Sequence, residues 1–197
     1  EMLKDVPYKK FMDLAVTIRM LVRVDETGMA SAIVTHDHTA RLGINEKDLY
    51  AAALKNTEFL FPVRINKLED VIRNLDSNGL VQEELPDTGI YVLSNLPRIA
   101  GATSILYAQD QIAELAKGLE CGFYVVPSST NEVLLCPDNT DMDPGMLQRT
   151  AMEVNEFVVS DTEFLSNSIY HIDKDSREIK MELPDPKIDD RQNQRGI

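Results

Sequence analysis

A cluster of hydroxyl, amide and carboxylate side chains joins two apolar runs, Tyr124–Val126 and Val133–Cys136. Such groups can hold an anion or orient a polar substrate, but the same composition is typical of a hairpin turn, where hydroxyls bond the local backbone. A serine nucleophile also needs a nearby base, and neither a histidine nor a Gly-x-Ser-x-Gly motif stands beside these serines. The candidate binding residues are Ser128, Ser129, Asn131 and Glu132, together with Asn95 from the end of another predicted strand.

The three histidines and one acidic loop are the candidates for a metal site. His36 and His38 stand two positions apart and His171 lies far along the chain, whereas zinc needs three or four ligands, so a helix cap or a solvated strand end is the favoured interpretation. The acidic segment 138–145 does not fit the EF-hand pattern, whether the loop is taken to start at Asp138 or at Asp141. We predict a solvated loop there, followed by a helix that Asp143 caps and Pro144 begins. We expect no metal and no cofactor, since no glycine-rich phosphate or dinucleotide motif is present.

Strands that come in pairs, with helices between the pairs, must position these side chains. This order predicts an α+β class, with an antiparallel sheet built from hairpins and helices packed on it. Strands are predicted at residues 16–24, 29–35, 90–94, 102–107, 122–126, 132–136, 168–172 and 178–183, helices at 46–60, 68–75, 111–119 and from 144, and a helical turn at 8–15. The helix from 144 is expected to bury Leu147, Ala151, Val154 and Val158.

We expect residues 1–183 to form a single domain, with a hinge between two subdomains at 76–89 as an alternative and a flexible C-terminal tail at 184–197. The strand pattern predicts that Val125→Asp or Leu134→Asp unfolds the domain. Ser128→Ala should cost little, because it lies in the connection between two strands.

The charge balance bears on partners and location. The chain has 33 acidic and 20 basic residues and a net charge of -13. Because such a surface repels phosphate and no run of Lys and Arg offsets it, we expect no nucleic-acid binding and no membrane binding. No apolar stretch approaches the roughly 18 residues of a membrane span, and no leader pattern opens the chain, so a cytoplasmic location is expected. Cys121 and Cys136 are expected to be buried free thiols, with a disulfide between neighbouring strands as the alternative.

Four segments, in this order, carry a resemblance: VPYKKFMDLAV (6–16), YVLSN (91–95, with Gly101-Ala102 after it), VPSSTNEVLLCP (126–137) and EVNEFVVSDTEFLSNSIYHID (153–173). The set resembles an uncharacterised bacterial family, domain of unknown function 5688, found mainly in gut anaerobes of the clostridial type. The resemblance covers most of the chain and implies no activity. It does imply a further N-terminal region, so that this chain would be the C-terminal portion of a longer protein.

The family pattern at the polar cluster reads Pro-Ser-Ser-Ile-His-Glu, and here Thr130 and Asn131 stand where Ile and His would be. An amide cannot take up a proton at neutral pH, so this departure weakens an enzyme interpretation. It leaves a hydrogen-bonding role intact.

Two classes of function therefore remain. The first is a non-catalytic cytoplasmic binding or protein-interaction module with an unknown protein or small-molecule partner, whose surface would include segment 96–101 and the apolar flanks of the cluster. It would show a large exposed apolar patch. The alternative is an enzyme of unrecognised type, a hydrolase or transferase on a small polar substrate, with its site around residues 128–132. It would show a pocket where these groups converge with an acid or imidazole of shifted pKa.

Overall fold

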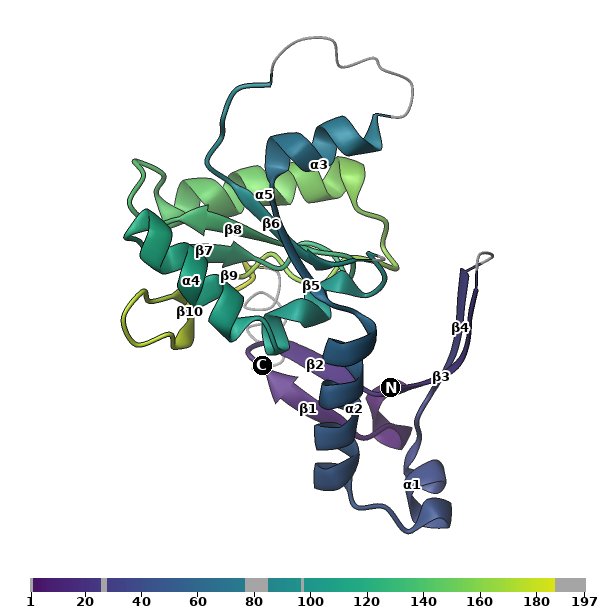
Figure 1. Ribbon diagram of the computed structural model, residues 1–197. Helices are drawn as coiled ribbons and strands as arrows, with labels where there is room; N and C mark the ends of the chain where they lie inside the picture. Colours follow the sequence, from purple (N-terminus) through teal and green to yellow (C-terminus); the bar gives the residue numbers. More distant parts are fainter. Residues whose placement is uncertain (1, 26–27, 77–84, 97, 187–197) are drawn as a thin grey trace, which may run out of the picture. The chain divides into compact units, whose positions relative to one another are not determined.

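A computed structural model describes residues 2–25, 28–76, 85–96 and 98–186 of the 197-residue chain (Figure 1). The chain divides into two compact units, Glu1–Leu60 and Phe61–Ile197. The predicted hinge segment 76–89 belongs to the second unit, and its residues 77–84 lie outside the described part. The two units are taken in turn.

The first unit consists of two hairpins and two helices. Its elements are η1 (Met2–Asp5), β1 (Tyr8–Phe11), β2 (Leu14–Thr17), β3 (Arg19–Asp25), β4 (Gly28–Ile33), α1 (His36–Leu42) and α2 (Glu46–Leu60). β1 pairs with β2 and β3 pairs with β4, both antiparallel, in separate two-stranded sheets. The predicted return strand and the helix after Asn45 are both confirmed, and the Asn45 side chain accepts a hydrogen bond from the Asp48 N–H at 2.9 Å.

The predicted helical turn over residues 8–15 is wrong. This segment is a hairpin in which Tyr8 pairs with Thr17 and Phe11 with Leu14, and Met12 at the turn has a left-handed φ of 52°. Cross-strand pairing satisfies the backbone groups of both short strands, which one helical turn would leave open at its ends. The predicted strand 16–24 is divided between β2 and β3, with Ile18 between them.

The first two histidines lie in the first turn of α1, and His38 takes part in its N-terminal cap, which agrees with the favoured interpretation of that pair. The Thr35 hydroxyl accepts from the His38 N–H at 3.3 Å, and His38 Nδ1 accepts from the Thr35 N–H at 3.2 Å. This reciprocal capping box satisfies two donors at the start of α1. His36 contacts the Glu46 carboxylate at 3.1 Å.

The second unit is built on one six-stranded antiparallel sheet. Its strands are β5 (Val63–Lys67), β6 (Tyr91–Asn95), β7 (Phe123–Val126), β8 (Val133–Pro137), β9 (Ile169–Ile172) and β10 (Ile179–Leu183), in the order β10-β9-β7-β8-β6-β5. Its helices are α3 (Leu68–Leu75), η2 (Gly101–Leu106), α4 (Gln109–Leu119) and α5 (Pro144–Val158). The predicted α+β class with an antiparallel sheet made of hairpins is confirmed.

The predicted strand at 102–107 is wrong, because these residues form the 3₁₀ helix η2. Its β-branched residues suggested a strand, but the Ser104 carbonyl accepts from the N–H groups of Tyr107 and Ala108 at 3.1 and 2.9 Å. The Ala102 N–H donates to the Thr130 carbonyl at 3.1 Å. This hydrogen bond attaches the start of η2 to the β7–β8 connection.

Alternation along the strands gives the sheet two buried faces. On one face Val126, Cys136 and Ile169 form a cluster with Leu147 of α5. Phe123, Val125 and Leu135 alternate with these residues, so they point to the opposite face, and each is fully buried. Figure 1 shows α5 on one side of the sheet and α4 on the other. The strands of this unit are therefore enclosed by helices on both sides.

The buried face of α5 differs from the predicted one. Val154 and Val158 are 49% and 75% exposed, whereas Leu147 and Asn155 are buried and Ala151 is half-buried. The inward stripe thus runs at positions i, i+4 and i+8 from Leu147. A polar side chain, Asn155, occupies its last position.

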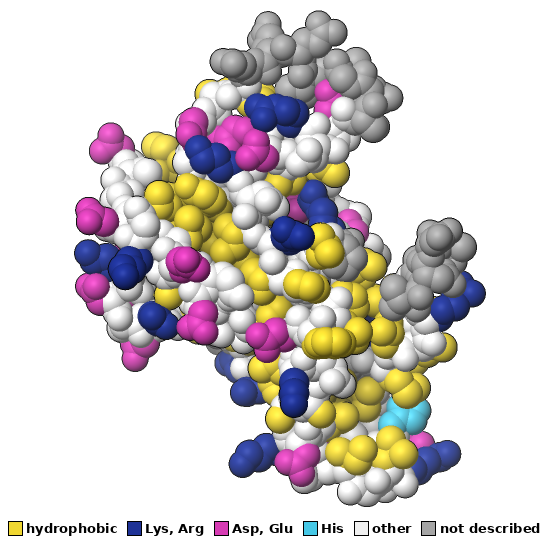
Figure 2. Space-filling model, viewed as in Figure 1, with side chains coloured by type: hydrophobic (Ala, Val, Ile, Leu, Met, Phe, Trp, Pro, Cys, Tyr) yellow, Lys and Arg dark blue, Asp and Glu magenta, His cyan; other side chains and the backbone are white. Residues whose placement is uncertain are grey.

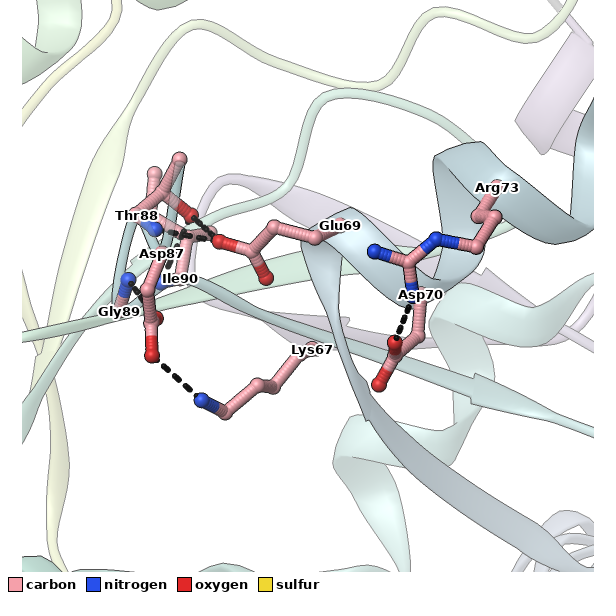
Figure 3. A network of polar contacts seen from close by, with 8 residues as sticks. All are labelled: Lys67, Glu69, Asp70, Arg73, Asp87, Thr88, Gly89 and Ile90. Carbon is pink, nitrogen blue, oxygen red and sulfur yellow. Dashed lines mark hydrogen bonds and ion pairs between the residues drawn. The ribbon is translucent and has the colours of Figure 1, made fainter. Parts of the chain in front are cut away.

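A polar network holds segment 85–90 against the start of α3 (Figure 3). The buried Glu69 carboxylate accepts through Oε1 from the Thr88 N–H and, at 2.8 Å, from the Thr88 hydroxyl. Lys67 Nζ lies 2.6 Å from Asp87 Oδ2, and Asp87 Oδ1 accepts from the Gly89 N–H at 3.0 Å. This part of the predicted hinge segment is therefore fixed to the unit that contains α3.

Acid is expected to loosen this network. The hydrogen bond from the Thr88 N–H lowers the pKa of Glu69, and the bond to Lys67 lowers the pKa of Asp87. Both carboxylates therefore stabilise the fold above their unfolded pKa values, and this contribution is lost as the pH falls through the lowered folded pKa values. Amide exchange at Thr88 should accelerate relative to Ala116 in α4 as the pH drops below about 4. In Glu69→Gln the ratio should depend less on pH, and an unchanged dependence would contradict this assignment.

Charged groups are mixed over the surface. Figure 2 shows Lys and Arg side chains interspersed with Asp and Glu on the face in view. Within the ranges that the structure describes, no helix combines the length and apolarity needed to cross a membrane.

Candidate binding site

The predicted polar cluster is the connection of the β7–β8 hairpin, which confirms the hairpin assignment. Val126 pairs with Leu134, and residues 127–132 link the two strands. The Ser129 hydroxyl accepts from the Asn131 N–H at 3.3 Å, and the Ser128 carbonyl accepts from the Leu165 N–H at 3.2 Å. Ser129 also forms an isolated β-bridge with Phe164. The connection is thus held along one side by the segment that follows α5.

Asn131 contributes to the same attachment through Glu163. Its side-chain amide donates to Glu163 Oε1 at 2.9 Å, while the Ser160 hydroxyl donates to Oε2 at 2.9 Å. Both hydrogen bonds lower the pKa of Glu163, and the bond from Asn131 has the larger effect. The Thr130 N–H donates to the Glu163 carbonyl at 2.8 Å. The Asn131 amide is therefore engaged in joining two loops.

The remaining predicted site residues lie beside this connection. Asn95, at the end of β6, turns to Ile99, donating to its carbonyl at 2.8 Å and accepting from its N–H at 3.1 Å. The neighbouring Ser94 reaches the cluster instead, because its hydroxyl donates to the Asn131 carbonyl at 2.7 Å. Glu132 forms an ion pair with Arg98. The structure thus brings Ser129, Asn131 and Glu132 into one framework with Ser94.

The third histidine belongs to a separate polar pair. His171 Nε2 lies 2.8 Å from Asp138 Oδ2, and Asp138 Oδ1 accepts from the Gly122 N–H at 2.9 Å. The acidic loop therefore begins with a carboxylate bound into the sheet, whereas we predicted a solvated loop; its far end caps α5 as predicted, because Asp143 accepts from the Met146 N–H at 3.1 Å. No group of three or more metal-binding side chains occurs among the residues described.

Both cysteines are free and buried. This confirms the favoured interpretation over a disulfide. Burial raises the pKa of Cys136 to about 12, and burial followed by the Asp138 charge raises the pKa of Cys121. Both thiols therefore stay protonated at neutral pH, a state that is a poor nucleophile.

A surface pocket of about 450 Å³ lies between α5 and the segment that follows it. Its volume falls within the range of small-molecule sites. Met152, Val159 and Phe164 supply apolar lining, and Asn155 and Asn167 supply amides. Phe164 is also the residue that bridges to Ser129, so the pocket and the β7–β8 connection share one supporting segment.

Two buried amide side chains give this pocket its polar lining. Asn155 is 6% exposed and Asn167 is 3% exposed, and Asn155 Nδ2 donates to Asn167 Oδ1 at 3.3 Å. Among the described residues, Asn155 Oδ1 and Asn167 Nδ2 have no hydrogen-bond partner. Neither atom is fully enclosed. Among the described residues, Glu69 Oε2 is the only side-chain atom that is fully buried and has no hydrogen-bond partner. The pair therefore presents one acceptor and one donor to the pocket; we name it the amide pair.

The backbone around the amide pair is firmly held. The Asn167 N–H donates to the buried Asp185 carboxylate at 3.1 Å. Gln148 of α5 donates to the carbonyls of Asn167 and Pro184, both at 2.9 Å. These contacts extend the packed chain to Asp185, two residues past the predicted domain boundary. Residues 187–197 of the predicted tail lie outside the described part.

Charged side chains surround the pocket unevenly. One base, Arg149, and three acids, Glu153, Glu156 and Asp161, are among its lining residues. The last turn of α5 has no basic residue to offset the negative end of the helix dipole. The end of the pocket near Val159 therefore has a negative potential.

Sequence reasoning missed this pocket. The predicted inward face of α5 includes Val154 and Val158 and does not include Asn155. The available signal was an Asn eight positions after Leu147 on a helix whose i, i+4 stripe begins with Leu147 and Ala151. Asn167 carried no comparable signal, because it precedes β9 in an irregular segment.

The fold and the pocket define an α+β protein whose six-stranded antiparallel sheet supports a polar surface pocket. The family model described as "Family of unknown function (DUF5688)" matches residues 1–174. The chain therefore belongs to this family, as the resemblance implied. No curated protein and no solved structure matches the chain.

Proposed function

We propose that this protein is a cytoplasmic, non-catalytic binding module and that its ligand enters the pocket of the amide pair. The observation that carries the proposal is the pair itself: Asn155 and Asn167 are buried residues that line the pocket, and they leave one acceptor and one donor atom without a partner among the described residues. The polar groups of buried side chains normally have hydrogen-bond partners. The amide pair therefore suits a ligand or a water molecule that supplies the two hydrogen bonds it lacks.

The polar cluster of residues 128–132 supports this proposal indirectly. Its Asn131 amide donates to Glu163 and the Ser129 backbone forms a β-bridge with Phe164, and both contacts position the segment carrying Phe164 at the pocket wall. A location in the reducing cytoplasm suits two buried thiols that remain unpaired.

A double-mutant cycle on the amide pair tests the proposal. Asn155→Leu alone should lower the free energy of unfolding by about 1–3 kcal/mol, because Asn167 Oδ1 loses its donor inside the protein. Asn155→Leu/Asn167→Leu should recover to within about 1 kcal/mol of wild type, since both polar side chains are then replaced by apolar ones. Urea unfolding measures all variants, including Asn167→Leu. A double variant that loses as much as the sum of the single variants would show that the two amides are not coupled and that each is needed for folding, which would contradict the proposal.

The binding readout uses acetyl-alanine methylamide, which carries two amide groups, each with one carbonyl and one N–H. Titration should shift the side-chain NH₂ resonances of Asn155 and Asn167 in ¹⁵N–¹H spectra. The folded double variant should show no saturable shifts at Phe164 and Val159, which also line the pocket. Saturable shifts that persist in the double variant would contradict the proposed role of the amides.

A further inference from the structure

We infer that the ligand is an extended peptide segment with a lysine or arginine side chain, an inference that rests on the proposed binding function. The amide pair presents an acceptor and a donor, which is the complement of the N–H and C=O of a peptide group. A peptide backbone could therefore form two hydrogen bonds with Asn155 and Asn167, which supply those atoms.

The dimensions of the pocket suit a chain of several residues. Its α5 lining runs from Arg149 to Val159, a rise of about 15 Å along the helix axis. An extended peptide advances about 3.3 Å per residue, so about four residues span this length.

The acidic side chains at one end of the pocket favour a positively charged side chain on the ligand. Among the described contacts, Glu156 and Asp161 have no cationic partner within ion-pair distance. They lie near the unneutralised C-terminus of α5, where a positive group is favoured. A Lys or Arg head group could meet these acids while its methylene stem packs on the apolar lining, which Val159 and Phe164 provide. The net charge of -13 would also attract basic partners at long range.

Three probes test this inference on the whole chain by ¹⁵N–¹H titration. They are acetyl-Ala-Lys-Ala-Ala-amide, the same peptide with norleucine in place of lysine, and n-butylammonium. The lysine peptide should shift the NH₂ resonances of the amide pair. It should bind about tenfold more tightly than the norleucine peptide, because only its ammonium group can pair with the acids.

The protein variants locate the charge effect. Glu156→Gln/Asp161→Asn should weaken the lysine peptide about tenfold and leave the norleucine peptide unchanged. Glu114→Gln/Asp175→Asn removes the same formal charge at exposed positions outside the pocket and should change neither affinity. Equal loss in both double variants would reduce the effect to general charge attraction and overturn the inference.

The remaining outcomes separate the two proposals. If both peptides shift the amide pair with equal affinity, the basic side chain is refuted and the binding pocket stands. If n-butylammonium binds as tightly as the lysine peptide without moving the amide resonances, the site recognises a cation and not a peptide. If no probe shifts any pocket resonance at millimolar concentration, the proposed function fails with the inference.

Discussion

Val125→Asp is expected to abolish folding at neutral pH. Val125 is fully buried in β7, a strand flanked by β9 and β8, and pairs with Tyr170 on one side and Leu135 on the other. An aspartate there must either bury an unpaired charge or take up a proton, and both cost free energy. We expect a loss of about 4 kcal/mol or more, which is comparable to the whole stability of a typical domain.

Far-UV circular dichroism and thermal unfolding check this expectation. The matched control is Val158→Asp, the same change at a site on α5 that is 75% exposed, and it should stay within about 1 kcal/mol of wild type, including the cost of an acid at the negative end of the helix. Leu134→Asp should be milder than Val125→Asp because Leu134 is half-buried, and Ser128→Ala should cost less than about 1 kcal/mol. A Val125→Asp protein that melts at the wild-type temperature would refute the central position of β7.

Gly101→Ala is expected to disrupt the attachment of η2 to the β7–β8 connection. A Cβ added at Gly101 would lie well under 3.0 Å from both the Asn131 carbonyl oxygen and the Ser94 hydroxyl oxygen. Cβ atoms in folded proteins essentially never approach another heavy atom this closely. The backbone must therefore shift, and the hydrogen bond of 2.7 Å between Ser94 and Asn131 cannot keep its geometry. We expect a loss of about 3 kcal/mol, at the upper end of the usual cost of overpacking.

The control is Gly118→Ala in α4, where an added Cβ meets no atom within 4 Å. This change should stabilise the protein by about 0.5–1 kcal/mol, because alanine loses less backbone entropy than glycine in a helix. Urea unfolding compares the two variants, and amide exchange at Ala102 reports the bond to Thr130 directly. Wild-type stability together with unchanged Ala102 exchange in Gly101→Ala would contradict the close packing described.

Elements with local signals could be predicted from the amino-acid sequence. The β7–β8 and β9–β10 hairpins followed from two apolar runs joined by a short polar link, and the structure confirms both pairings. The same holds for α3, whose predicted limits match, and for the cap at Asp143. In each case neighbours a few positions apart supply the hydrogen bonds, so the pattern and the contact lie in the same short segment.

Elements whose partners are distant in sequence could not be predicted in this way. Residues 102–106 have strand-like composition, yet the bond from Ala102 to Thr130 and the packing of Gly101 on Ser94 accompany a 3₁₀ helix. The inward face of α5 depends on which side of the helix packs against the sheet. The helix has two apolar stripes, and the one that contains Leu147 faces inward. The amide pair joins Asn155 to Asn167 across a change of chain direction, and Asp185 supports it from beyond β10. Such contacts form only when the sheet assembles and brings distant segments together, so local periodicity carries no signal for them.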